Sequence, residues 1–134
     1  MRGGDRSIEI VTGYLQSFAS GDPDRIAGYV ADGFHNEHLS ALGSGCVGRD
    51  EYRRRLPHFL ESFADRSYQV IDVVEQQRES IDSIVVRYRF LATYEGVRID
   101  IPGVMWFAVR DDAITRRTDV WDSMTFLEQT GQTD

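Results

Sequence analysis

The first half of the chain has apolar residues at the spacing of amphipathic helices. In the first helix, four of them fall at i, i+3, i+4 and i+7 and share one face: Val11, Tyr14, Leu15 and Phe18. Ser7 can cap this helix, and Asp22 followed by Pro23 predicts the start of a second one. A third helix is predicted over residues 50–63, where Pro57 either bends the helix or lies near its true start.

The second half changes to an alternation of apolar and polar residues with a period of two. This pattern predicts strands over residues 68–75, 84–94, 97–110 and 114–122. Glu95-Gly96 and Asp111-Asp112 are expected to form tight turns between neighbouring strands. A short extended segment is expected over residues 34–38, and a last helical turn over residues 124–129.

Helices followed by a meander of long strands are typical of an α+β fold. We expect a single domain, residues 1–134, in which a curved antiparallel sheet wraps over the N-terminal helices as an open cone (a cystatin-like α+β barrel). Side chains are not expected to fill such a cone completely, so the fold predicts one apolar pocket.

Charge and cysteine content limit the kinds of partner and the cellular compartment that we expect for this protein. The formal net charge is −7 and the basic residues form no stripe, so we expect no nucleic-acid partner. The single cysteine, Cys46, cannot form an internal disulfide, which favours a reducing compartment. The first residues lack an apolar signal segment, and no apolar run approaches the ~20 residues of a membrane span. We therefore expect a cytoplasmic protein without membrane contact.

Neither a metal nor an organic cofactor is expected. The sequence carries no phosphate-binding loop and no dinucleotide fingerprint. His35 and His38 are close in the sequence, but on a strand they face opposite sides, and no third ligand is placed beside them.

Several segments resemble the nuclear-transport-factor-two-like superfamily. They are Tyr14 to Phe18, Ser20-Gly21-Asp22, Ala31-Asp32, Gly48-Arg49 and the closing Ile114 to Asp122. Within the superfamily the chain is similar to SnoaL-like polyketide cyclases, ketosteroid isomerases and limonene epoxide hydrolases, from about residue 8 to 131. The resemblance implies the cone fold, but members of this fold differ widely in function.

The resemblance also implies roles for individual residues. Tyr14 matches the oxyanion-hole tyrosine of the isomerases, and His38 matches their aspartate base or a water-holding asparagine of the hydrolases. Asn36 matches a water-holding tyrosine of the hydrolases. Asp119 matches their catalytic aspartate, and Trp121 matches a pocket tryptophan of the isomerases.

The chain also departs from both catalytic patterns. The Arg-x-Asp pair of the hydrolases falls on Val86 and Tyr88, and the second oxyanion donor of the isomerases falls on Met105. Arg98-Ile99-Asp100 mimics the hydrolase pair, but it lies one strand too late to take that role.

Strand periodicity places the candidate polar groups together. Asn36 and His38 share one face of their strand, as do Arg117, Asp119 and Trp121 on the last strand. We predict three catalytic residues: Tyr14, His38 and Asp119. We predict four substrate-binding residues: Asn36, Tyr88, Arg117 and Trp121.

Each of these residues also has a purely structural interpretation. Arg117 and Asp119 could form a structural ion pair, which would hold the carboxylate ionised and make His38 the better base. Tyr14, Tyr88 and Trp121 could be ordinary core or pocket aromatics, and Asn36 and His38 could bond to the backbone or complete a turn.

Three functions remain open on this basis. The first is a cofactor-independent enzyme that performs acid/base chemistry on an apolar small molecule such as a polyketide, steroid or terpenoid, as an isomerase, dehydratase, cyclase or epoxide hydrolase. The second is a non-catalytic binding module for such a ligand, and the third is a dimeric assembly domain. In all three, Val85, Leu91 and Trp106 on the outer sheet face favour a homodimer.

Overall fold

The first helices form as the apolar spacing predicts. The computed structural model describes residues 3–133. Helix α1 (Gly3–Ser17) continues into a 3-10 turn, η1 (Phe18–Ser20), and Asp22 caps the short helix α2 (Pro23–Ala27) by accepting from two backbone N–H groups. The prediction that Ser7 caps the first helix is wrong. Ser7 lies inside α1, where it is buried and its hydroxyl donates to Asp82 Oδ2 at 2.6 Å.

Two short strands precede the third helix. They are β1 (Val30–His38) and β2 (Cys46–Val47), and α3 (Arg49–Ser62) follows directly. Gly48 joins β2 to α3 with φ +97°, a left-handed conformation that favours glycine. Pro57 lies inside α3, so the helix neither ends nor begins there. The buried side of α3 carries Tyr52, Leu56 and Leu60, spaced four residues apart.

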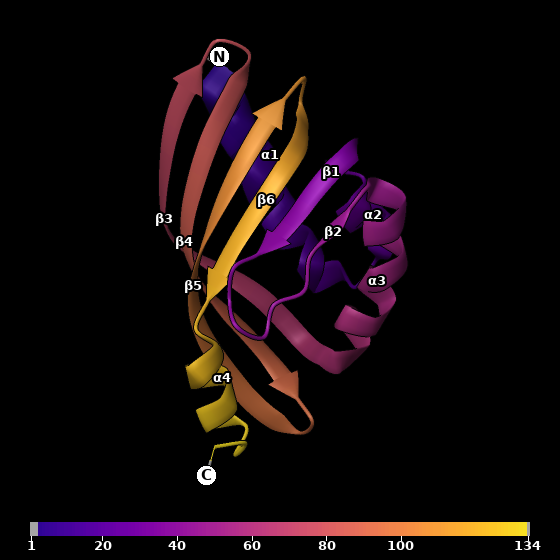
Figure 1. The fold of residues 1–134 in the computed structure, drawn as a ribbon, viewed down its shortest axis with the longest axis vertical. Helices are drawn as coiled ribbons and strands as arrows, with labels where there is room; N and C mark the ends of the chain where they lie inside the picture. The colour runs from indigo at the N-terminus through magenta and orange to yellow at the C-terminus, as the bar shows by residue number, and fades with distance from the viewer. Residues whose placement is uncertain (1–2, 134) are drawn as a thin grey trace.

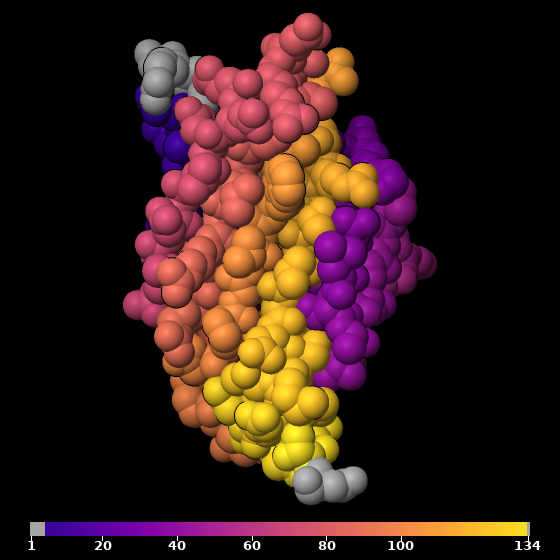
Figure 2. Space-filling model, turned by 60° about the vertical axis from the view of Figure 1, so that its left-hand side comes forward, coloured from indigo at the N-terminus to yellow at the C-terminus, as the bar shows by residue number. Residues whose placement is uncertain are grey.

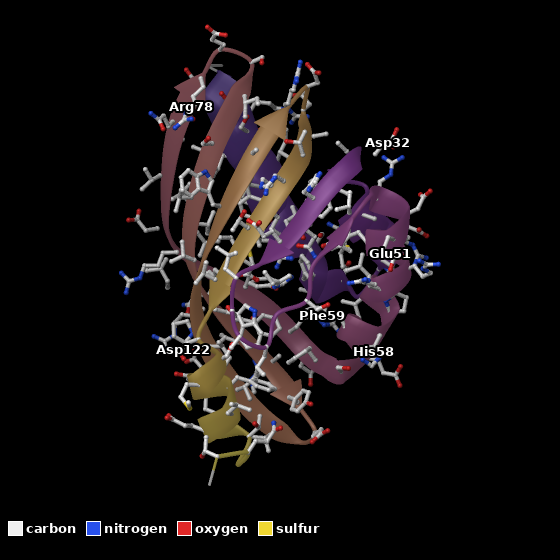
Figure 3. The ribbon with its side chains drawn as sticks, in the orientation of Figure 1. Asp32, Glu51, His58, Phe59, Arg78 and Asp122 are labelled. Carbon is white, nitrogen blue, oxygen red and sulfur yellow. The ribbon has the colours of Figure 1, made fainter. Side chains whose placement is uncertain are left out.

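Four long strands and a final helix make up the rest of the chain. The strands are β3 (Phe63–Arg78), β4 (Ile81–Tyr94), β5 (Val97–Arg110) and β6 (Ala113–Trp121). Both residues of the Asp111-Asp112 turn have positive φ, 51° and 59°, as the predicted tight hairpin requires. Asp122 caps α4 (Ser123–Gln129), and its place at the end of β6 is visible in Figure 3.

The strands form one curved, unclosed sheet in the order β2-β1-β6-β5-β4-β3 (Figure 1). Consecutive long strands pair antiparallel, as the meander predicts. The sheet is not antiparallel throughout, because β1 runs parallel to β6. This pairing joins residues that are about eighty positions apart in the chain, and local periodicity carries no information about it.

The helices cover one face of the sheet and leave the other face open. Helix α1 packs against β3 and β4, and α3 packs against β1 and β3. The core lies between these layers and contains the alternate residues of β4 that begin with Ile84, Val86 and Tyr88. Figure 2 shows β3 to β6 side by side on the opposite face, with α4 at one end. The result is the predicted α+β cone.

A helix that crosses a membrane must be both long and apolar. Among the helices of residues 3–133, none combines the length and the apolar character that crossing a bilayer demands.

Candidate functional site

Asp119 is the carboxylate at the centre of the buried polar cluster. Its side chain points to the inner face of β6, and the residue is only 3% exposed. The Tyr88 hydroxyl donates to Oδ1 at 2.6 Å, and Arg117 NH2 donates to Oδ2 at 3.2 Å. Arg117 is two residues away on the same strand, so the period of two places both side chains on one face.

Strand β1 supplies two further members of the cluster. Its parallel register pairs Asn36 with Arg117 and His38 with Asp119. Arg117 NH1 donates to Asn36 Oδ1 at 3.1 Å. His38 Nδ1 lies 3.8 Å from Asp119 Oδ2, which is beyond hydrogen-bond distance. This nitrogen is buried and has no hydrogen-bond partner among the described residues.

Arg117 links the members of the cluster to one another. Besides Asn36 and Asp119, its guanidinium donates to the Tyr68 hydroxyl and to Met105 Sδ, each at 3.4 Å. Burial alone would lower the pKa of Arg117, but Tyr14 and Asp119 raise it, and the result lies above the ordinary value. Arg117 is therefore a permanent cation inside the fold, although it is only 4% exposed.

Burial shifts the pKa values of the two candidate bases, Asp119 and His38, in opposite directions. Burial raises the pKa of Asp119 and outweighs the lowering by Arg117 and Tyr88. Burial, together with the Arg117 charge, lowers the pKa of His38 to about 3. His38 is thus a neutral imidazole at neutral pH, and its contact with Asp119 is not an ion pair. The ion pair with Arg117 does form, but Asp119 rather than His38 is the better base.

Tyr14 lies below the guanidinium of Arg117, with Cζ 5.9 Å from the ring centroid. Its hydroxyl is hydrogen-bonded to the hydroxyl of Tyr52 on α3, and both residues are buried. Burial raises the pKa of both phenols, so each remains protonated. The two hydroxyls carry two protons and share one hydrogen bond, which leaves one O–H able to donate elsewhere.

Trp121 is the predicted site residue that lies apart from this cluster. It is half-buried at the end of β6 and packs against Phe126 of α4, with ring centroids 6.0 Å apart. The structure therefore brings together six of the seven predicted residues, namely Tyr14, Asn36, His38, Tyr88, Arg117 and Asp119.

Sequence analysis missed two tyrosines of the cluster, Tyr52 and Tyr68. Tyr52 continues the spacing of Leu56 and Leu60 along α3, so its burial could have been read from the helix pattern. Tyr68 lies on β3, paired with Phe90, and its hydroxyl accepts from Arg117. Burial raises the pKa of Tyr68, so this phenol is also neutral.

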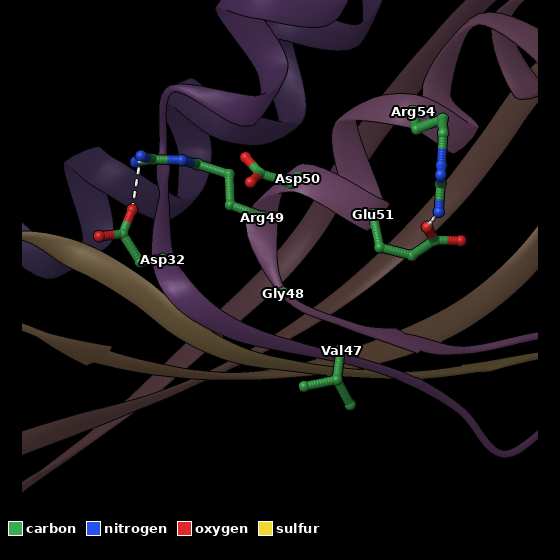
Figure 4. A pocket seen from close by; sticks show the side chains of 7 residues that line it. All are labelled: Asp32, Val47, Gly48, Arg49, Asp50, Glu51 and Arg54. Carbon is green, nitrogen blue, oxygen red and sulfur yellow. Dashed lines mark ion pairs between the residues drawn. The ribbon is translucent and has the colours of Figure 1, made fainter.

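Two hollows in the structure lie outside the cluster. One, of about 420 Å³, is on the outer sheet face, and Tyr88 and Trp121 reach its lining. The other, of about 490 Å³, is at the start of α3, where Arg49 pairs with Asp32 and Arg54 with Glu51 (Figure 4). Asp119 lines neither hollow. The apolar pocket inside the cone stays a prediction.

The side chains that commonly bind metals are dispersed in this fold. Within residues 3–133 no group of three or more His, Cys, Asp or Glu side chains gathers as metal ligands would.

Comparison with known proteins identifies the family. The family model for the SnoaL-like domain matches residues 11–117. The chain belongs to the SnoaL-like family. A search of the curated proteins gave no match.

Solved structures of SnoaL-like and related proteins share the fold. A candidate polyketide cyclase from Xanthomonas campestris pv. campestris is 21% identical, with a TM-score of 0.72 over 96% of this chain and 98% of that chain. An epoxide hydrolase from M. tuberculosis, described as similar to limonene epoxide hydrolase, is 14% identical, with a TM-score of 0.82 over 96% and 87%. TerC, crystallised with polyporic acid, is 20% identical, with a TM-score of 0.79 over 94% and 98%. At this level of identity these neighbours establish the fold of the SnoaL-like chain and nothing beyond it.

Proposed function

We propose that this SnoaL-like protein is a small enzyme that performs acid/base chemistry on an apolar small molecule without a metal or organic cofactor. The observation that carries the proposal is the buried Asp119, whose pKa burial raises and whose carboxylate is surrounded by Tyr88, Arg117 and His38. A carboxylate of this kind is a stronger base than one in water.

Asp119 is assigned the role of the base. It accepts a proton from a substrate carbon or from a water molecule and returns that proton to the product. Arg117 and the free O–H of the Tyr14–Tyr52 pair are the groups able to stabilise negative charge on a substrate oxygen. His38 Nδ1 lies 3.8 Å from Asp119 Oδ2 and has no partner among the described residues, so it is available to a water or a substrate hydroxyl. Asn36 and Tyr88 complete the site through their hydrogen bonds to Arg117 and Asp119, and Trp121 stays outside it.

Two observations support the proposed substrate class, namely the aromatic interior and the fold neighbours. The core around the cluster is aromatic, with Tyr14 against Phe18 and Phe107, and Tyr88 against Tyr68. Among the fold neighbours are a candidate polyketide cyclase, an epoxide hydrolase and a protein crystallised with polyporic acid. A polyketide, steroid or terpenoid fits both observations. The reaction is an isomerisation, dehydration, cyclisation or epoxide opening.

A second function, non-catalytic binding of the same ligands, is favoured by one observation. Both oxygens of Asp119 already have a donor inside the fold, as expected of a structural ion pair. The residues at the positions of the hydrolase pair, Val86 and Tyr88, also leave that catalytic set incomplete.

We also propose that the protein is a cytoplasmic homodimer that packs through the outer sheet face. Four apolar residues of this face are exposed: Val74, Val104, Trp106 and Val120. Val85 and Leu91 on the same face are half-buried. Val85 pairs with both Val74 and Trp106, so these side chains form a continuous row across β3, β4 and β5.

Turnover and binding measured together test the proposed function. Aromatic polyketides, enolisable steroid ketones and terpene epoxides are incubated with the wild type and with Asp119→Asn, and binding to each protein is measured in parallel. The enzyme is supported if one class is converted and Asp119→Asn binds but does not convert it. If a class binds to both proteins and neither converts it, the binding module is the better description.

A further inference from the structure

Gly103 interrupts the row of large side chains on the inner face of β5. Its neighbours on that face, Ile101 and Met105, are both buried. Glycine weakens a strand interior, and its presence there often marks a close approach of another group. The backbone does not demand glycine here, because the φ angle of Gly103 lies outside the left-handed region. The reason must therefore be steric.

The group that approaches Gly103 is the ring of Tyr88, its partner across β4 and β5. A Cβ atom at position 103 would lie 2.5 Å from Cζ and 2.9 Å from Cε1 of this ring, and closer still to the hydroxyl oxygen. The ring packs edge-on against Tyr68 with centroids 5.3 Å apart, so making room for this atom would shift the ring and its hydroxyl together. An alanine at 103 would therefore displace the Tyr88 hydroxyl.

The side chain of Tyr88 lies over Gly103 and so reaches Asp119. Tyr88 belongs to β4 and Asp119 to β6, and β5 lies between them. Strands two apart in a sheet are separated by roughly 9.5 Å, so the tyrosine must lie across the intervening strand. It does so and donates to Asp119 Oδ1 at 2.6 Å. This hydrogen bond favours the charged carboxylate.

We propose that Gly103 is a positioning residue that sets the protonation of Asp119 by leaving room for the Tyr88 hydroxyl. This inference rests on the proposed function for one point, the role of Asp119 as the base. The geometry by itself requires that a larger residue at 103 breaks the Tyr88–Asp119 hydrogen bond. The carboxylate then keeps Arg117 as its donor and binds its proton more tightly.

The test is an NMR titration of the Asp119 carboxyl carbon in the full chain, without substrate. Gly103→Ala and Tyr88→Phe should each raise the pKa of Asp119 above that of the wild type. The double variant should raise it no further than Tyr88→Phe alone. Gly33→Ala is the matched control, since Gly33 is an exposed strand glycine at which an added Cβ would meet nothing within 4 Å, and it should leave the titration unchanged.

A stability cycle keeps the proposal testable if Gly103→Ala folds poorly. Overpacking at 103 should lower the Tm by roughly 5–15 °C when Tyr88 is present. Tyr88→Leu removes the ring, so adding Gly103→Ala to that variant should lower the Tm little further. An equal loss of Tm in both backgrounds, or a Gly103→Ala protein whose Asp119 titrates as in the wild type, would overturn the proposal. Because no substrate is involved, neither result depends on whether the protein is an enzyme.

Discussion

His38 Nδ1 and Asp119 Oδ2 face each other across the parallel pair of β1 and β6 at 3.8 Å. The distance is too long for a hydrogen bond, and the imidazole nitrogen has no other partner among the described residues. Because burial lowers the pKa of His38 to about 3 and raises the pKa of Asp119, the carboxylate is the base and the imidazole stays neutral.

Asp119→Asn is expected to lower turnover by about 10²–10⁴-fold, because positioned acid/base groups typically contribute that much. The amide keeps the shape of the side chain and one acceptor for Tyr88 or Arg117, so the fold and ligand binding should persist, at a lower stability because Arg117 loses its anion. Steady-state kinetics with circular dichroism measures both effects. Asp122→Asn changes an exposed helix cap outside the cluster and serves as the matched control. Wild-type turnover by Asp119→Asn would refute the assignment of the base.

His38 should make the folded protein less stable in acid. The unfolded chain binds a proton at His38 with a pKa near 6.5, whereas the folded protein binds it only near 3. The free energy of unfolding therefore keeps the full contribution of His38 above pH 6.5. As the pH falls towards 3 it loses on the order of 5 kcal/mol.

Urea unfolding of His38→Gln across pH 3–7 measures this contribution. The variant should lose less stability on acidification than the wild type. His58→Gln removes an exposed imidazole of α3 (Figure 3) and should retain the acid sensitivity of the wild type, because His38 is still present. Parallel curves for His38→Gln and the wild type would show that burial of His38 is not the cause.

The buried pair of Arg117 and Asp119 should be strongly coupled. Arg117→Leu leaves a buried carboxylate without its cation, and Asp119→Leu leaves a buried guanidinium without its anion, so each should cost about 3–5 kcal/mol. The double variant removes both charges and should cost clearly less than the sum of the two. Chemical unfolding of the four proteins gives the coupling energy. Additive losses would mean that the two charges are not energetically linked.

The proposed dimer places Trp106 in its interface, since this side chain is 53% exposed on the outer sheet face. Trp106→Glu buries an unpaired charge in that interface and should shift the mass from light scattering to that of a 15.3 kDa monomer. Val97→Glu places the same charge at the start of β5, away from this row, and should keep the dimer mass. A monomeric wild type at micromolar concentration would rule the dimer out.

Local patterns in the sequence determined the elements and the faces of the strands. The strand predicted over residues 97–110 is the one observed, and the alternation along β4 separates buried from exposed residues as predicted. These features depend only on the period of a strand or helix, which neighbouring residues encode. The sequence also placed Asn36 with His38, and Arg117 with Asp119, each pair on one face.

Only the tertiary structure decided how these faces meet. The parallel pairing of β1 with β6 brings His38 to Asp119. The packing of α3 on the sheet adds Tyr52, and the edge strand β3 adds Tyr68. In the sequence Gly103 is an ordinary strand glycine, and only the structure shows that the Tyr88 side chain lies over it. The protonation of His38 and Asp119 also depends on the tertiary structure, because desolvation and nearby charge act through space between residues that are distant in the chain.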